Sequence, residues 1–384
     1  MTDANRGVLD ALLRHDLTAF TQRCFQTVVP GQTYLSNWHI EAIAHRLERC
    51  RQREIRRLIV TLPPRSLKSI CASVAFPAFA LGHDPSLRII CASYSQDLAA
   101  KHARDFRTVL ESAWYRRLFP HTRIDPRKNT EGEIQTTAQG YRLSTSLGGT
   151  LTGRGGNLLL IDDPMKPTER MSEVKRAAVS EWYDSTLISR LDSKTEGAIV
   201  LIMQRLHVDD LVGHVLDKDE AWTHLNLPAI AEEDEEIPLS NGRFHRRKAG
   251  ELLHPAREPM EVLEELKAAM GSQSFSAQYQ QAPIPAGGAL IKAEWFGTYA
   301  QAPEPARGER VVQSSPRRPG RRTTFPSARP GSCGVGTMAL QGFEWVTRGS
   351  EMPQNGLSRP PQAVQGRLRR PLRGFALDGL RRPR

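Results

Sequence analysis

Two stretches decide the fold class: RRLIVTLPPRSLKS at positions 56–69 and NLLLIDDP at positions 157–164. In the first, a short apolar run rich in β-branched residues stops at two prolines, as a buried strand does, and an apolar helix is expected after Ser69. In the second, five uncharged residues end in two aspartates. This is typical of a central parallel strand with carboxylates at its C-terminal edge.

Strands and helices alternate around these two stretches. Helical spacing of apolar residues predicts helices at 38–51 (behind a cap at Ser36), 96–111, 172–191 and 260–270. Strands are expected at 88–93 and 197–203, and a hairpin at 133–137 and 141–146. The alternation predicts an α/β fold with a parallel sheet flanked by helices.

The chain has a net charge of +11, but this charge is not evenly distributed. Of 53 basic and 42 acidic residues, 14 arginines and 3 acids lie in 315–384, which leaves 39 of each sign before them. The basic charge therefore belongs to the tail and does not indicate that the folded part binds nucleic acid. With 9 prolines, 10 glycines and only 12 Leu, Ile, Val and Phe, this tail is expected to be disordered.

The N-terminus lacks the basic start and apolar core of a secretory signal, and the most apolar stretch, 70–81, is short and contains Pro77. We expect no membrane segment and a cytoplasmic protein. Five scattered cysteines without a C-x-x-C pair indicate reduced, mostly buried thiols.

A nucleotide-hydrolysing site needs a lysine for the phosphates, a hydroxyl and a carboxylate for Mg²⁺, and a group that positions water. Lys68 and Ser69 lie between a strand and a helix, where a helix N-terminus favours phosphate. Asp162 is a candidate Mg²⁺ ligand, and Asp163 is a candidate for orienting or activating water. The order of these features predicts a nucleotide site.

The phosphate loop departs from the pattern G-x-x-x-x-G-K-[ST], because Leu62 and Leu67 stand at the two glycine positions. A leucine where the backbone needs positive φ would strain the loop by ~1 kcal/mol or more. Each motif also has a simpler interpretation: the loop as a helix start without ligand, and Asp163-Pro164 as a turn. Only their joint order favours the nucleotide site.

Five stretches, in this order, resemble the large terminase subunits of tailed phages and prophages: LIVTLPPRSLKS, AFPAFALGHDPSLRIICASYSQDLAAKHARDFR, GGTLTGRGGNLLLIDDPMKP, IVLIMQRLHVDDLVG and SFSAQYQQAP. The resemblance covers roughly 38–299. It implies a P-loop NTPase-like ATPase domain at 36–225, after an N-terminal helical segment at 1–35 and before a connecting subdomain at 226–302. It also implies an ATP- and Mg²⁺-dependent ring at the capsid portal that threads double-stranded DNA, with the terminase small subunit and portal protein as partners.

The resemblance assigns roles to particular residues. The phosphate loop would comprise Pro64, Arg65, Ser66, Leu67, Lys68 and Ser69, with Arg65 sensing the γ-phosphate. Ser69 and Asp162 would hold Mg²⁺, and Asp163 would be the catalytic carboxylate. Gln204 would contact the nucleotide site within a motif that couples hydrolysis to movement, and adenine would lie near 32–39.

Two further assignments have alternatives. Arg154 would act in trans on a neighbouring subunit's ATP, or it merely closes a Gly-rich turn. RLHVDDLVG at 205–213 contains metal-binding residue types, but we interpret it as a capped helix start.

Family members continue into an RNase H-like nuclease, whose first aspartate is expected near 310–314. Here only Glu344, Glu351 and Asp378 follow, none on an expected strand, so residues 303–384 are interpreted as a truncated or frameshifted remnant without nuclease activity. A genuine basic tail that binds DNA phosphates is the alternative. A P-loop helicase or remodelling ATPase, and an inactive prophage fragment, are the competing functions.

Overall fold

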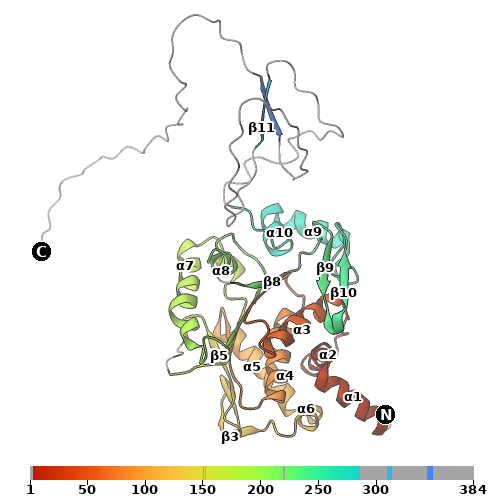
Figure 1. Cartoon of the computed structure of the whole chain (residues 1–384), viewed down its shortest axis with the longest axis vertical. Coiled ribbons are helices and arrows are strands. Elements are labelled where there is room, and N and C mark those ends of the chain that lie inside the picture. Colours follow the sequence, from red (N-terminus) through yellow and green to blue (C-terminus); the bar gives the residue numbers. More distant parts are fainter. Residues whose placement is uncertain are drawn as a thin grey trace, which may run out of the picture. The chain divides into compact units, whose positions relative to one another are not determined.

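The computed structural model describes residues 3–149, 151, 153–218, 221–285, 309–313 and 344–348 (Figure 1). The chain divides into two compact units, residues 1–296 and residues 297–384. The candidate site lies in the first unit.

The first unit is built on an eight-stranded sheet in the order β3-β4-β5-β2-β6-β7-β1-β8. The strands from β5 to β8 in that order are parallel, and β3 and β4 extend the sheet as antiparallel strands. The strands are β1 Arg57–Thr61, β2 Arg88–Ser93, β3 Ile124–Asn129, β4 Glu133–Thr136, β5 Tyr141–Ser146, β6 Leu158–Asp162, β7 Ala198–Met203 and β8 Thr223–Asn226. The predicted parallel α/β sheet is therefore confirmed.

Helical segments lie on both faces of this sheet (Figure 1). They are α1 Asp3–His15, α2 Leu17–Val28, α3 Trp38–Arg51, η1 Ile70–Ala75, α4 Phe76–His83, α5 Gln96–Glu111, α6 Ala113–Leu118, η2 Pro167–Glu169, α7 Glu173–Glu181, η3 Trp182–Leu187, η4 Ile188–Arg190 and α8 Leu211–Leu216. Within the described residues, no helix has the length and apolar character needed to cross a bilayer.

The central strands are apolar because both of their faces are covered. Along β6, Leu158 and Leu160 pack in the core shared with α2–α5, while Leu159 and Ile161 pack in the core shared with α7 and α8. The strand is fully buried from end to end. This two-sided burial explains why β1, β6 and β7 could be recognised as short continuous apolar runs.

The register of the central strands brings their carboxyl ends to one edge. Asp162 at the end of β6 pairs with Ser93 on β2 and with Ile202 on β7, and Thr61 at the end of β1 pairs with Met203. Residues that directly follow β1, β6 and β7 therefore meet at this edge, where ligands of open parallel sheets usually bind.

Most predicted elements are confirmed, with two local differences. Asn37, and not Ser36, is the N-cap of α3, and its side chain makes no capping hydrogen bond. The helix expected over 172–191 changes after Glu181 into the π-helix η3 and the 3₁₀ turn η4. There the Ser185 hydroxyl donates to the Glu181 carbonyl, which competes with the regular helical pattern.

The region after β8 contains a hairpin and two helices. They are β9 Glu235–Pro238, η5 Ser240–Gly242, β10 Phe244–Arg247, α9 Met260–Met270 and α10 Ser272–Gln278. A small core of its own includes Leu263, Phe275 and Tyr279. The four cysteines in the described part of the chain are buried and free, as expected.

In the second unit, β11 Glu309–Gln313 pairs with β12 Glu344–Arg348 in antiparallel register. Glu344 therefore lies on a strand, which corrects the expectation that it does not. The expected disorder of the Arg-rich tail otherwise concerns residues outside those that the structure describes.

Candidate functional site

The structure brings the lysine, the hydroxyl and both aspartates together at the carboxyl edge of the sheet. The Lys68 ammonium lies 3.1 Å from Asp163 Oδ2. The Ser69 hydroxyl donates to Asp162 Oδ1 at 3.2 Å. Lys68 and Ser69 follow β1, whereas the aspartates end β6, and β7 lies between these two strands. The juxtaposition predicted from the order of motifs is thus present.

A second layer of buried polar groups lies behind Asp162. The Ser73 hydroxyl donates to Asp162 Oδ2 at 2.7 Å, and His102 Nδ1 lies 3.6 Å from the same oxygen. Arg142, only 1% exposed, donates to the Ser73 carbonyl at 3.0 Å and lies over the Phe106 ring. The positive charges of Lys68 and Arg142 therefore compensate the negative charges of the buried aspartates.

Burial dominates the acid–base properties of these groups. It raises the pKa of Asp162 and of Asp163, while the Lys68 ammonium opposes the rise in both. Burial also lowers the pKa of His102 to about 4, so this ring is neutral at neutral pH. A carboxyl with a raised pKa beside a lysine is better suited to accept a proton than an exposed aspartate.

The phosphate loop adopts a conformation that usually requires glycine. Arg65 and Leu67 have φ values of 63° and 60°, whereas Ser66 between them is not in the left-handed region. Such alternation turns successive backbone N–H groups toward one side, as in anion-binding nests. Leu67 occupies the second glycine position of the phosphate-loop pattern, so the predicted backbone strain is located there.

An arginine from outside the predicted motifs holds the outer side of this loop. Arg257 donates to the carbonyl of Arg65 and, at 3.3 Å, to the carbonyl of Pro64. Its guanidinium also contacts Glu258 at 2.8 Å. Arg257 thereby supplies hydrogen-bond donors to these two loop carbonyls. Since this contact joins distant parts of the sequence, no local pattern could have indicated it.

The opposite wall of the site is the junction of β6 with β7. Asp163 has φ 46°, its N–H donates to the Ile202 carbonyl at 3.0 Å, and its Oδ1 accepts from the Gln204 N–H at 3.4 Å. The Gln204 side chain is 7% exposed, and its Oε1 has no hydrogen-bond partner among the described residues. Gln204 is therefore close to Asp163.

Arg154 is not brought to this site within the chain. It precedes β6, at the end of the strand opposite to Asp162. Its guanidinium contacts Glu133 at 2.6 Å and lies over the Tyr141 ring. A role for Arg154 on a neighbouring subunit stays a prediction.

Two other assigned segments have clear local structures. Asp210 caps α8 by accepting from the Gly213 N–H at 3.1 Å, which confirms the predicted capped helix start. In the segment 32–39, His39 is 2% exposed and its ring centroid lies 5.7 Å from that of His254. Burial, together with the charge of His254, lowers the pKa of His39 to about 3.

The donor set fits an Mg²⁺-nucleotide. A serine hydroxyl and a carboxylate are the protein ligands that Mg²⁺ receives in P-loop proteins, and the nest and Lys68 suit phosphate oxygens. Four residues that support this donor set were not predicted from the sequence. They are Ser73, His102 and Arg142, which lie behind Asp162, and Arg257, which lies on the outer side of the loop. Ser73 lies four residues after Ser69, so helical spacing was the one available signal.

Fold and sheet topology define an α/β protein with a mostly parallel sheet flanked by helices. Among solved structures, it is similar to the large terminase of bacteriophage HK97, at 13% identity and a TM-score of 0.40 over 70% of this chain and 54% of that one. The chain thus spans about half of that protein.

Two further structures show comparable similarity. A mutant ATPase domain of a Thermus phage large terminase matches at 14% identity and a TM-score of 0.40, over 68% of this chain and 98% of that domain. A large terminase from a thermophilic bacteriophage, in complex with ADP, matches at 10% identity and a TM-score of 0.36, over 60% of this chain and 51% of that one. No protein-family model and no curated protein matches the sequence.

Proposed function

We propose that this chain is the ATPase part of a terminase large subunit, an Mg²⁺-dependent ATP hydrolase that drives double-stranded DNA into a phage capsid. The observation that carries the proposal is the meeting of Lys68 and Ser69 with Asp162 and Asp163 at one sheet edge. The five sequence stretches that resemble large terminases support the substrate and the motor role. They include the loop 58–69 and the aspartate segment 148–167.

Each residue then has a distinct task. The nest and the Lys68 ammonium bind the phosphates, while Ser69 and Asp162 hold Mg²⁺, which neutralises charge on the phosphate oxygens when bound. Asp163 orients a water molecule and accepts its proton, and Gln204 supplies an amide oxygen beside it. Arg65 contacts the terminal phosphate from within the loop.

Because Lys68 contacts Asp163, the phosphate and the Asp163 carboxylate compete for the Lys68 ammonium. A phosphate oxygen that binds Lys68 has to replace the Asp163 carboxylate as its partner, and this releases Asp163 to interact with water. Phosphate binding and activation of the carboxylate are thereby linked.

The proposed partners and setting follow from the same resemblance. The chain would act as a homo-oligomeric ring with the portal protein and the terminase small subunit, in the cytoplasm of a bacterial host. Arg154 would serve the ATP of a neighbouring subunit.

The test is phosphate release by the full chain with Mg²⁺ and ATP, with and without double-stranded DNA, compared with Lys68→Ala and Asp163→Ala. We expect hydrolysis by the wild type and at least a hundredfold loss in both variants, because Asp163→Ala removes the proton acceptor and Lys68→Ala removes the cation that binds the phosphates. Equal rates in all three proteins would refute the site. ATP-driven strand separation of a labelled duplex would favour a helicase instead.

A further inference from the structure

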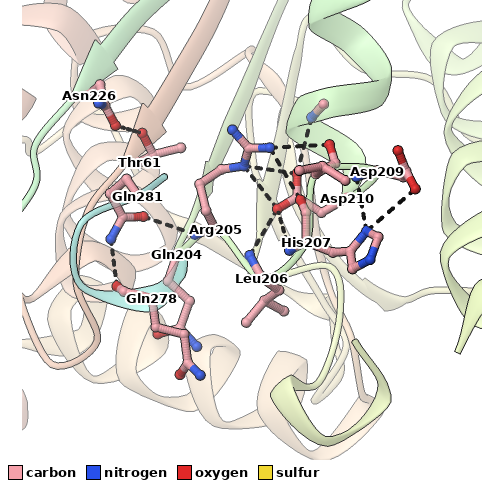
Figure 2. Close-up of polar contacts among 12 residues, drawn as sticks. Thr61, Gln204, Arg205, Leu206, His207, Asp209, Asp210, Asn226, Gln278 and Gln281 are labelled. Atoms are coloured by element: carbon pink, nitrogen blue, oxygen red, sulfur yellow. Dashed lines mark hydrogen bonds and ion pairs between the residues drawn. The ribbon is translucent and has the colours of Figure 1, made fainter. Parts of the chain in front are cut away.

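The carboxyl end of β7 connects the candidate site to a glutamine far along the sequence. The Gln204 N–H faces Asp163 Oδ1 at 3.4 Å. The next N–H, that of Arg205, donates to Gln281 Oε1 at 2.9 Å (Figure 2). Two adjacent backbone N–H groups therefore bind, in turn, the proposed catalytic carboxylate and the Gln281 side chain.

Gln281 is held in a fixed and unusual conformation. It is 5% exposed, and its Nε2 donates to the Gln278 carbonyl at 2.5 Å (Figure 2). Its φ of 56° is in the left-handed region, as are those of Arg65, Leu67 and Asp163 at the site. For residues other than glycine such conformations persist only where the surroundings enforce them, and they cluster at functional sites.

The Arg205 side chain prevents the same peptide from moving independently. Its Nε donates to Asp210 Oδ2 at 2.9 Å, and the Asp210 carboxylate also accepts from the N–H groups of Leu206 and Gly213 (Figure 2). The end of β7 is thus clamped between the cap of α8 and the amide of Gln281.

We propose that Gln281 is a positioning residue of the candidate ATPase site. Its amide holds the Gln204–Arg205 peptide, which directly follows the Met203–Gln204 peptide that binds Asp163, and it transmits displacements of Asp163 to the segment 278–285. This inference rests on the function proposed above for the catalytic step, but the physical link itself does not require hydrolysis.

The neighbouring glutamine provides a matched control. Gln280 anchors the same segment by accepting from the Ile230 N–H at 3.0 Å and donating to the Ile230 carbonyl at 3.0 Å. Its hydrogen bonds go to the residues after β8 and not to the end of β7. If Gln281 merely anchored its segment, Gln280→Met and Gln281→Met would have the same consequences.

The experiment combines amide hydrogen exchange with kinetics on the full chain. In Gln281→Met we expect the Arg205 N–H to exchange at least about tenfold faster, because a buried donor loses its acceptor. We also expect kcat for ATP to fall about tenfold with little change in KM, since Lys68 and Ser69 are untouched. Gln280→Met should leave both quantities within about twofold of the wild type. Equal effects of the two substitutions would overturn the proposal.

A reciprocal measurement keeps the test decisive if Gln281→Met does not fold. Coupling between two positions acts in both directions, so Asp163→Ala should change exchange in the peptide 278–282 of a chain with intact Gln281. Unchanged exchange there would refute the link. If the wild type hydrolyses no ATP while both exchange effects are present, the proposed function fails and the link stands.

Discussion

Lys68 and Asp163 form an ion pair of 3.1 Å in which both side chains are largely buried, the lysine at 8% and the aspartate at 21% exposure. Each group therefore depends on the other for compensation of its charge. In the proposed mechanism the two have separate partners, phosphate for the lysine and water for the carboxylate. The ion pair is thus a structural contact that nucleotide binding has to break.

Asp163→Asn should separate binding from hydrolysis. Removal of the carboxylate charge frees Lys68 for phosphate, so affinity for a fluorescent ATP analogue should rise about tenfold, equal to ~1.4 kcal/mol. Phosphate release should fall at least a hundredfold, because no group remains to accept the proton of water. Asp209→Asn, at an aspartate whose side chain is 71% exposed, is the control and should change neither quantity. Weaker binding by Asp163→Asn would contradict the competition.

Leu67→Gly tests the strain in the phosphate loop. A glycine removes a left-handed backbone cost of about 1–2 kcal/mol and also removes the Leu67 side chain, which packs against the core. We expect a net stability change within about 1 kcal/mol, because the two effects oppose each other. ATP hydrolysis should rise several-fold, since the loop then adopts the phosphate-binding conformation without strain.

Asn241→Gly is the matched control for this substitution. Asn241 has φ 59° in the turn η5, outside the candidate site. It should alter thermal stability slightly and leave ATP hydrolysis unchanged. If Leu67→Gly reduces hydrolysis, the leucine side chain is needed by the site.

Arg257→Met should weaken nucleotide binding without affecting the chemical step. The guanidinium satisfies the carbonyls of Pro64 and Arg65, and its loss leaves the strained loop unsupported. We expect KM for ATP to rise about tenfold, corresponding to a lost hydrogen bond to a charged group, with kcat nearly unchanged. Arg246→Met is the control, because Arg246 is 79% exposed and contacts Glu236 away from the loop. A fall in kcat at constant KM would disagree with a purely supporting role.

The sequence was sufficient to predict the central strands and the groups that follow them. β1, β6 and β7 are covered on both faces, so their apolar runs stand out, and parallel strands bring their carboxyl ends together. Leu67 could be identified as strained because the phosphate-loop pattern places glycine at its position. The edge strand β8 was missed because it is short and polar, with only Leu225 buried.

The supporting contacts could not be predicted in the same way. Arg257 and Gln281 reach the site across long separations in sequence, and Arg142 is a buried cation whose position gives no local signal. The contacts of Arg257 and Gln281 depend on the packing of the region after β8 against the sheet. Sequence patterns indicate which residues carry the chemistry, whereas the residues that hold them in place emerge only from the tertiary structure.

The buried histidines predict a loss of stability in mild acid. Burial lowers the pKa of His39 to about 3 and that of His102 to about 4. Both lie below the ordinary value of 6.5, so the unfolded chain takes up protons that the folded chain refuses. The stability contributed by keeping these two rings neutral is complete above pH ~6.5. It is lost as the pH falls toward the pKa values of the histidines in the folded chain. At pH ~5 each should lower the free energy of unfolding by about 2 kcal/mol.

The measurement is thermal unfolding between neutral pH and pH ~5 for the wild type and His39→Gln. The His39 Nδ1 lies 2.5 Å from the Asn37 amide nitrogen, and a glutamine amide oxygen can accept this hydrogen bond without taking up a proton. The variant should therefore lose less stability on acidification than the wild type, by about 2 kcal/mol at pH ~5. Parallel pH dependences for the two proteins would show that His39 is not held in its neutral form by the fold.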